Sequence, residues 1–141
     1  MKYLLDTNII SELISRQPTA HVTEWIDSLD PNSVYLSVLT VGEIRKGIAR
    51  LSSSKRKESL TYWLTDDLMI RFSDHILPLD VGVMLLWGQL TGELAAQDVN
   101  LPFADSLIGA TALHHQCILV TRNEADFRHI GVTVVNPWNE S

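Results

Sequence analysis

Short apolar runs that alternate with longer helical patterns are the feature that most constrains the fold of this chain. Each run is bounded by polar residues or proline and is too short for a helix, which is typical of a buried strand. The helical segments between the runs, together with the scarcity of hairpin signals, predict an α/β fold whose parallel sheet is covered by helices on both faces. The expected strands are residues 2–5, 34–37, 76–79, 117–121 and 133–135.

Apolar residues at helical spacing predict the elements that cover this sheet. The clearest pattern steps by 3, 4 and 3 positions along one helix face, at Val41, Ile44, Ile48 and Leu51. Pro102 is expected to open a helix over residues 103–115, since proline is favoured at a helix start. The sequence has no internal repeat, and 141 residues suit one domain, expected over residues 1–141. Further helices are expected within residues 9–14, 22–29, 60–68 and 83–97.

Composition limits the class of protein. The sequence has 11 basic and 17 acidic residues and a formal net charge of −6, which disfavours a protein that coats duplex DNA non-specifically. Cys117 is the only cysteine, which excludes an intrachain disulfide and a Cys-rich zinc site. No apolar stretch approaches the roughly 18 residues that span a bilayer. The sequence therefore predicts a cytoplasmic protein with no membrane partner.

Four acidic residues have positions that suggest a site. Asp6 directly follows the first expected strand, and Asp126 follows the expected strand at 117–121. Parallel sheets bind ligands outside the carboxyl ends of their strands. Glu43 and Asp105 lie on expected helices that could pack beside the same edge.

Taken together, the four carboxylates predict a site for a hard divalent cation. Mg²⁺ and Mn²⁺ prefer oxygen ligands and are usually bound by one or two carboxylates, waters and substrate phosphate. Carboxylates that share a pocket repel one another, and a bound cation relieves that repulsion. Such a cation could activate a water and stabilise the leaving oxygen of a phosphodiester.

Each of these acids, taken singly, also has a structural explanation, which for Glu43 is an exposed position paired to Lys46 or Arg50. Asp6 could cap the helix that follows it. Asp105, in a first helical turn, could complement the helix dipole, and Asp126 could be an ordinary turn residue. Taken one at a time, the residues therefore leave both explanations open.

The basic residues are concentrated in one segment. Six of the eleven lie within residues 45–57, which contain no acid. Lys46 and Arg50 follow Glu43 by three and seven positions, so all three are expected on one helix face. This basic segment could be solvated surface, with Glu43 paired to one of the cations, or it could contact the phosphates of a nucleic acid.

Two other classes of function stay open. A module that binds RNA or a protein partner without cutting is one. A phosphotransfer domain or an aspartyl-phosphate phosphatase is the other, since both place an Asp after the first strand. Both need a lysine late in the chain, however, and none follows Lys57; the phosphatases also need a second Asp where this sequence has Asn8. The motifs of P-loop proteins, dinucleotide-binding folds and serine hydrolases with a nucleophile elbow are absent.

Five segments in this order resemble one known family. The chain is similar to the PIN-domain ribonucleases and, more narrowly, to the VapC toxins of bacterial toxin–antitoxin pairs, in their FitB-like branch. The resemblance covers nearly the whole sequence. The segments that carry it are residues 3–8, 36–44, 103–112, 119–127 and 135–138.

The resemblance implies a PIN-like fold, with a parallel five-stranded sheet of order 3-2-1-4-5 flanked by helices on both faces. It also implies endoribonuclease activity that depends on Mg²⁺ or Mn²⁺, with Asp6 and Asp105 as metal ligands. Two further acids are implied to complete the pocket and two polar residues to orient the acids, at Glu43 and Asp126 and at Thr121 and Asn123 respectively.

The same resemblance implies partners. RNA is the expected substrate, with structured RNAs such as tRNA among the family's targets. A cognate VapB-like antitoxin is expected to block the pocket, and the chain is expected to form a homodimer or a larger toxin–antitoxin assembly. On this interpretation the basic segment, residues 45–57, contacts either RNA or the antitoxin.

Overall fold

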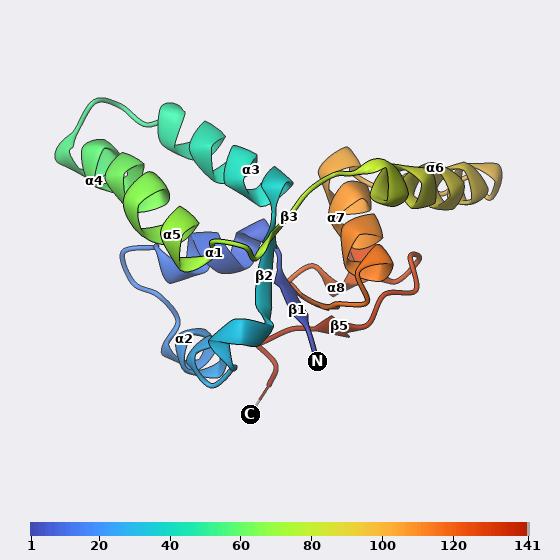
Figure 1. Cartoon of the computed structure of the whole chain (residues 1–141), viewed down its shortest axis with the longest axis horizontal. Coiled ribbons are helices and arrows are strands. Elements are labelled where there is room, and N and C mark those ends of the chain that lie inside the picture. Colours follow the sequence, from blue (N-terminus) through green and yellow to red (C-terminus); the bar gives the residue numbers. More distant parts are fainter. Residues whose placement is uncertain (141) are drawn as a thin grey trace.

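A five-stranded parallel sheet forms the centre of the computed structural model, which describes residues 1–140 (Figure 1). The strand order is β3-β2-β1-β4-β5, and every adjacent pair is parallel. The α/β class and the strand order are therefore confirmed. Residue 141, the last of the expected single domain, lies outside the described residues. The strands are β1 (Tyr3–Leu5), β2 (Val34–Ser37), β3 (Ile76–Leu77), β4 (Ile118–Val120) and β5 (Val134–Val135).

Four strands are shorter than the sequence pattern predicts: β1 and β5 each begin one residue later than expected, and β3 and β4 are shortened for local backbone reasons. The expected strand at 76–79 ends at Leu77, because Pro78 has no N–H to donate to a neighbouring strand. The expected strand at 117–121 begins at Ile118, because the Cys117 N–H donates to the carbonyl of Ala112, at the end of the preceding helix (2.8 Å).

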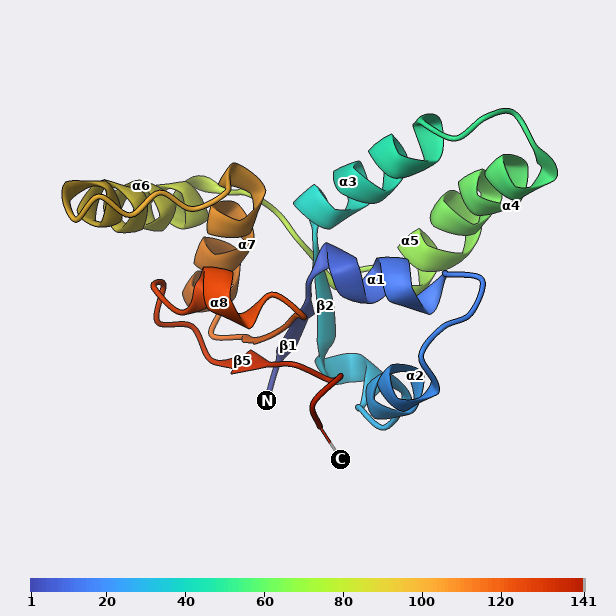
Figure 2. The ribbon, with the colours of Figure 1, turned by 180° about the vertical axis from the view of Figure 1, so that it is seen from behind.

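Helices cover both faces of the sheet, as expected. Alternate strand residues point to opposite faces, so Leu5 packs in one apolar cluster and Leu4 in the other. The first cluster includes α1 and α3, and the second includes α7 and α8. Figures 1 and 2 show these groups on either side of the strands. The helices of the first group are α1 (Thr7–Leu13), α2 (Ala20–Asp27), α3 (Val38–Ala49), α4 (Lys55–Trp63) and α5 (Met69–Arg71), and those of the second are α6 (Val81–Ala96), α7 (Phe103–His114) and α8 (Glu124–Phe127).

The helix expected over residues 60–68 is interrupted. α4 ends at Trp63, and a π-helical turn, η2 (Leu64–Leu68), joins it to α5. The wide turn keeps Leu64 and Leu68 buried in the first cluster. A shorter 3-10 turn, η1 (Pro31–Ser33), precedes β2 and is capped by the Asp30 carboxylate.

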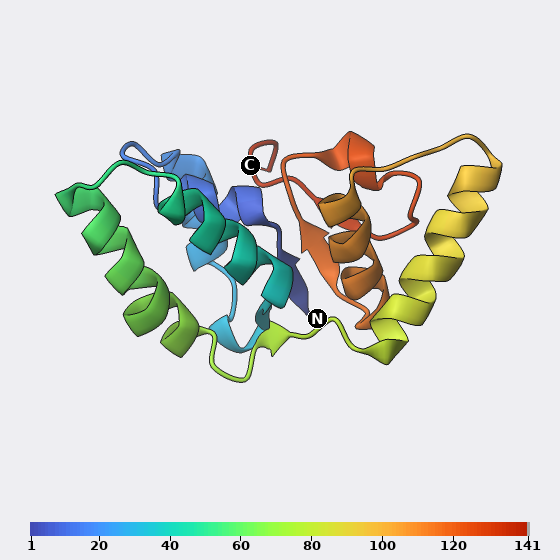
Figure 3. The same cartoon turned by 90° about the horizontal axis from the view of Figure 1, so that it is seen from above.

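Two helix pairs, α3 with α4 and α6 with α7, form arms on opposite sides of the sheet, with α4 and α6 as their outer helices (Figure 3). α6 is joined to α7 by the Trp87 indole N–H, which donates to the Ser106 hydroxyl at 2.8 Å. Its outer surface exposes apolar side chains, with Val81 and Leu85 more than 70% exposed. Among residues 1–140, no helix is both long and apolar enough to cross a membrane.

Candidate active site

The register between β1 and β4 sets the centre of the site. Leu5 lies opposite Val120, so the residues that follow them, Asp6 and Thr121, lie side by side at the carboxyl edge of the sheet. The Thr121 hydroxyl donates to Asp6 Oδ2 at 2.8 Å. Asp6 also caps α1, because its Oδ1 accepts the Thr7 N–H at 2.7 Å. Only 3% of the surface of Asp6 is exposed. Asp6 therefore both caps α1 and contributes a carboxylate to the site.

Polar groups around Thr121 fix it in turn. The Asn8 amide donates to Thr121 Oγ1 at 3.2 Å and to Asp6 Oδ2 at 3.4 Å. The Asn123 backbone N–H also donates to Thr121 Oγ1, at 3.1 Å. Of the two residues expected to orient the acids, Thr121 therefore binds Asp6 directly, whereas Asn123 acts on Thr121 through its backbone.

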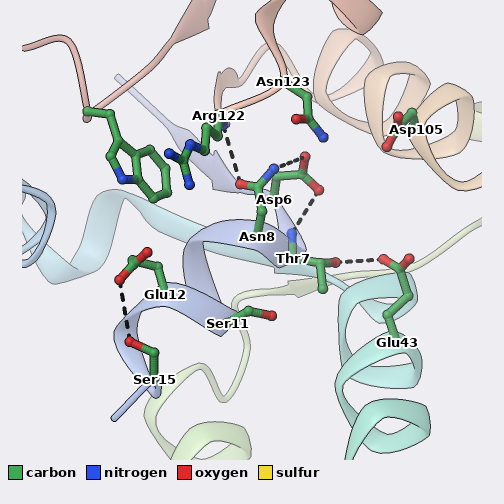
Figure 4. A pocket seen from close by; sticks show the side chains of 11 residues that line it. Asp6, Thr7, Asn8, Ser11, Glu12, Ser15, Glu43, Asp105, Arg122 and Asn123 are labelled. Atoms are coloured by element: carbon green, nitrogen blue, oxygen red, sulfur yellow. Dashed lines mark hydrogen bonds between the residues drawn. The ribbon is translucent and has the colours of Figure 1, made fainter. Parts of the chain in front are cut away.

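Glu43 reaches the site from α3. Ser37 ends β2 and caps this helix by accepting the Leu39 N–H at 3.0 Å, which places the helix beside the sheet edge. The Thr7 hydroxyl donates to Glu43 Oε1 at 2.6 Å. Since Thr7 has a single hydroxyl hydrogen, the buried Thr40 hydroxyl is the donor in its 3.0 Å contact with Thr7. Glu43 is half-buried and turned toward Asp6, not toward bulk solvent (Figure 4).

Asp105 comes from the other side of the sheet edge. It lies in the first turn of α7, as expected, and faces Asp6 and Glu43 across the cavity (Figure 4). Asp126 lies on α8, a short helix that the sequence analysis does not anticipate. Its carboxyl interacts with those of Asp6 and Asp105, although it does not line the cavity itself.

Burial and neighbouring carboxyl groups raise the pKa of two of the acids, Asp6 and Asp105. Burial raises the pKa of Asp105 to about 7, and the charges of Asp6, Asp126 and Glu43 add to this effect. Burial is also the main reason why the pKa of Asp6 is raised, but the hydrogen bonds from Thr121 and Thr7 act in the opposite direction. The site therefore holds negative charge that its own residues do not neutralise.

A cavity of about 480 Å³ connects these acids to a second group of residues. Asp6, Glu43 and Asp105 are at one end, and Arg122 is at the other (Figure 4). Sequence reasoning missed this second group, although Arg122 and Trp138 lie within two of the segments that carry the family resemblance. Its members besides Arg122 are Ser11, Glu12, Ser15 and Trp138.

The donor set suits a hard cation that keeps part of its water shell. The acids that line the cavity offer only carboxylate oxygens, the ligands that Mg²⁺ and Mn²⁺ prefer. Within residues 1–140, no three acidic, histidine or cysteine side chains are gathered so as to hold a metal ion by themselves. A Mg²⁺ bound by one or two carboxylates, with waters and a substrate phosphate as its other ligands, needs no such group.

The basic segment divides into two parts. Lys46 is exposed in the last turn of α3, and Arg50 is exposed at the C-cap of this helix. Lys57, in contrast, donates to the carbonyls of Ala49 and Leu51 (3.3 and 3.0 Å) at the end of α3. Arg56 likewise donates to a backbone carbonyl, that of Ile14, at 3.3 Å. Part of the segment therefore stabilises the α3–α4 arm.

Comparisons with known proteins agree with this geometry. The PIN domain family matches residues 3–132. Toxin FitB of Neisseria gonorrhoeae is 38% identical over 97% of this chain and 99% of its own length. VapC ribonuclease Y4jK of Sinorhizobium fredii is 32% identical over 96% of each chain. The solved structure of FitAB bound to the IR36 DNA fragment has a TM-score of 0.93 and 37% identity, over 99% of this chain and 97% of that chain.

The raised pKa of Asp105 predicts how the metal-free protein responds to pH. Unfolding returns this pKa from about 7 to 3.8, so ionisation of Asp105 lowers the stability of the fold as pH rises between these values. We expect Asp105→Asn to raise the melting temperature in EDTA by about 3–5 °C at about pH 8, and by less at about pH 5. Differential scanning calorimetry measures both.

Two variants serve as comparisons in the same experiment. Asp67→Asn removes an exposed carboxylate of η2, and its effect should be small at both pH values. Asp6→Asn should raise the melting temperature by less than Asp105→Asn, because it alters a carboxylate that accepts a hydrogen bond from the Thr121 hydroxyl. A lower melting temperature for Asp105→Asn at about pH 8 would show that the carboxylate stabilises the metal-free fold and that the charge argument is wrong.

Proposed function

The chain belongs to the PIN domain family, and from that premise we propose that it is the toxin of a toxin–antitoxin pair and hydrolyses RNA as a metal-dependent endoribonuclease. The observation that carries the proposal is the meeting of Asp6, Glu43 and Asp105 in one cavity at the carboxyl edge of the sheet. The names of two relatives, Toxin FitB and VapC ribonuclease Y4jK, support the toxin and the ribonuclease parts respectively.

Asp6 and Asp105 are the proposed ligands of Mg²⁺ or Mn²⁺. When bound, the cation supplies positive charge that lowers the pKa of a water and stabilises the leaving oxygen of the phosphodiester. The Thr121 hydroxyl and the Asn8 amide hold Asp6 in its orientation. The hydroxyl of Thr7 engages one oxygen of Glu43.

Glu43 and Asp126 are the proposed supporting acids. With its Oε1 held by Thr7, Glu43 can accept a proton from the attacking water at its other oxygen. Asp126 acts through Asp105, because its charge raises the pKa of that carboxyl and so increases the attraction of the pair for a cation.

The nuclease proposal predicts that each proposed metal ligand is essential. We expect Asp6→Asn and Asp105→Asn each to lower the rate of RNA cleavage in Mg²⁺ by at least about 10²-fold, since each removes a charged ligand. EDTA should abolish wild-type cleavage, and added Mg²⁺ or Mn²⁺ should restore it. A gel assay on a bulk tRNA pool measures these rates.

Circular dichroism checks that both variants remain folded. Asp67→Asn, remote from the cavity, should cut at the wild-type rate. If wild-type protein binds RNA but does not cut it with either cation, the chain is a binding module without nuclease activity. Wild-type cleavage that persists in EDTA would contradict the role of the metal.

A protein partner is the second part of the proposal. The solved structure of FitAB on DNA contains a relative of this chain in a complex. For this chain, we propose that a cognate antitoxin covers the cavity. The carboxylates at its acidic end favour a partner that inserts Lys or Arg. The exposed Val81 and Leu85 on α6 support a further contact with a second copy, because exposed apolar side chains gathered on one helix favour association.

Expression of the native operon tests both parts of this assembly. We expect a small partner to co-purify with the chain and to inhibit its nuclease activity, because the partner's cation competes with Mg²⁺ for the carboxylates. Light scattering after gel filtration should give a mass that contains two copies of the chain. Recovery of the chain alone, as a fully active monomer, would contradict the proposed assembly.

Lys46 and Arg50 are proposed RNA contacts. A protein of net charge −6 repels RNA, so a local basic surface has to offset that repulsion. These two side chains are exposed in the last turn and at the C-cap of the helix that carries Glu43. Unlike Lys57 and Arg56, neither donates a hydrogen bond to a backbone carbonyl of residues 1–140.

The double variant Lys46→Gln/Arg50→Gln tests this surface. We expect RNA binding to weaken at low salt, and the slope of log K against log [salt] to become shallower by about 0.7 for each phosphate that the variant no longer binds. Fluorescence anisotropy of a labelled single-stranded RNA in EDTA measures the slope. Arg16→Gln, which also removes an exposed cation, is the control. An unchanged slope would assign the two residues to solvated surface or to the antitoxin.

A further inference from the structure

Arg122 and Trp138 form a fixed pair at the end of the cavity opposite Asp105. The Arg122 guanidinium lies over the Trp138 indole, 4.7 Å from the ring centroid. Such cation–π contacts are attractive and hold the guanidinium plane against the ring. Among the described residues that line the cavity, Arg122 is the only one with a positive charge. The pair is remote in sequence, since Arg122 follows β4 and Trp138 follows β5.

The backbone of Arg122 is tied to the acidic centre. Its N–H donates to Asn8 Oδ1 at 3.3 Å, and the amide of the same Asn8 donates to Asp6 Oδ2 at 3.4 Å. The preceding residue, Thr121, binds Asp6 through its hydroxyl and β5 through its N–H, which donates to the Val135 carbonyl at 3.0 Å. These hydrogen bonds fix the backbone of Arg122, from which its side chain extends, relative to Asp6.

Trp138 is held just as firmly from the other side. Its backbone N–H donates to Asn136 Oδ1 at 3.0 Å, and the amide of the buried Asn136 side chain donates to the Glu124 carboxylate of α8 at 3.2 Å. The indole also packs against the first apolar cluster. The indole is thus anchored in the protein, while Arg122 lies over its ring and both side chains line the cavity.

Glu12, a further carboxylate of the cavity lining, is engaged elsewhere. Glu12 Oε2 accepts the Thr19 N–H at 3.0 Å and the hydroxyls of Thr19 and Ser15 at 3.4 Å. These bonds direct Glu12 toward the α1–α2 connection. The donors of Arg122 therefore remain available to an anion in the cavity.

We propose that Arg122 binds a phosphate of the RNA next to the scissile one, and that Trp138 is a positioning residue that holds the guanidinium for this contact. The inference rests on the proposed ribonuclease function. A strand that enters the cavity carries repeated phosphates, of which a cation bound by the acids can receive only one. The Arg122 guanidinium, at the end of the cavity opposite the acids, suits the neighbouring phosphate, because its N–H donors match the geometry of phosphate oxygens.

Substitution of Arg122 by Gln should weaken substrate binding more than chemistry. We expect KM for the tRNA pool in Mg²⁺ to rise about tenfold, as for removal of one charge-assisted hydrogen bond, with kcat changed by less than about twofold. In EDTA, where no cleavage occurs, the salt slope of binding to a labelled single-stranded RNA should become shallower by about 0.7.

Further variants separate phosphate binding from a structural role. Arg122→Lys should keep the salt slope and recover only part of the affinity, since it keeps the charge but not the planar fork. Trp138→Leu should raise KM by a smaller factor, without changing the slope. Arg128→Gln, at the exposed end of α8 outside the cavity, should behave as wild type.

The two proposals fail in different ways. If the wild-type chain cuts no RNA, the ribonuclease function is wrong, and the salt titration in EDTA still tests Arg122 alone. Arg122 is not a phosphate contact if Arg122→Gln retains the wild-type KM and slope, if only kcat falls, or if Arg128→Gln has the same effect. Loss of affinity for the antitoxin alone would also overturn the proposal.

Discussion

The pairing register of β1 is the constraint on which the site depends. β1 lies between β2 and β4, and the match of Leu5 with Val120 places Asp6 beside Thr121. A shift of one residue would turn Leu4 and Leu5 toward the wrong apolar clusters. The hydrophobic effect that fixes the sheet therefore also fixes the carboxylate. Helices α3 and α7 bring their acids to the same place from opposite sides of the sheet, so no flexible loop has to position Glu43 or Asp105.

The charges of the site act against this packing. Asp6 is almost fully buried and Asp105 is half-buried, and the charge of Asp6 raises the free energy of the ionised form of Asp105. Neutral donors, namely Thr121, Asn8 and Thr7, hold the acids without cancelling their charge. The negative potential of the carboxylates is therefore available to a ligand. A metal ion and a cationic side chain of a protein partner would compete for the same carboxylates. Catalysis and inhibition would then use one electrostatic feature.

Much of the fold and of the acidic centre can be predicted from the sequence, because both follow from local patterns. The five strands are visible as apolar runs, and Asp6 is adjacent to the first of them. The other end of the cavity has no such signal: Trp138 reaches it from the segment after β5, which is held by hydrogen bonds of Asn136 to Glu124 and to the Trp138 backbone. The π-helical turn at residues 64–68 is equally hidden, since no Gly or Pro marks it and the apolar residues keep helical spacing. The role of Lys57 as a cap for α3 depends on the geometry of the α3–α4 turn, which spacing alone does not give.

The half-buried position of Asp105 affects what kind of inactive protein results when the gene for this chain accumulates substitutions. Most random substitutions that inactivate an enzyme also harm its folding, and the product is then removed by cellular proteases. Loss of the Asp105 charge is different, because it relieves repulsion among the acids and leaves the backbone of α7 intact. Selection against toxicity to the host cell can therefore retain a variant that is inactive but fully folded. Such a variant would keep the surfaces that bind a partner, and it would persist as a decoy that titrates the antitoxins of active copies in the same cell.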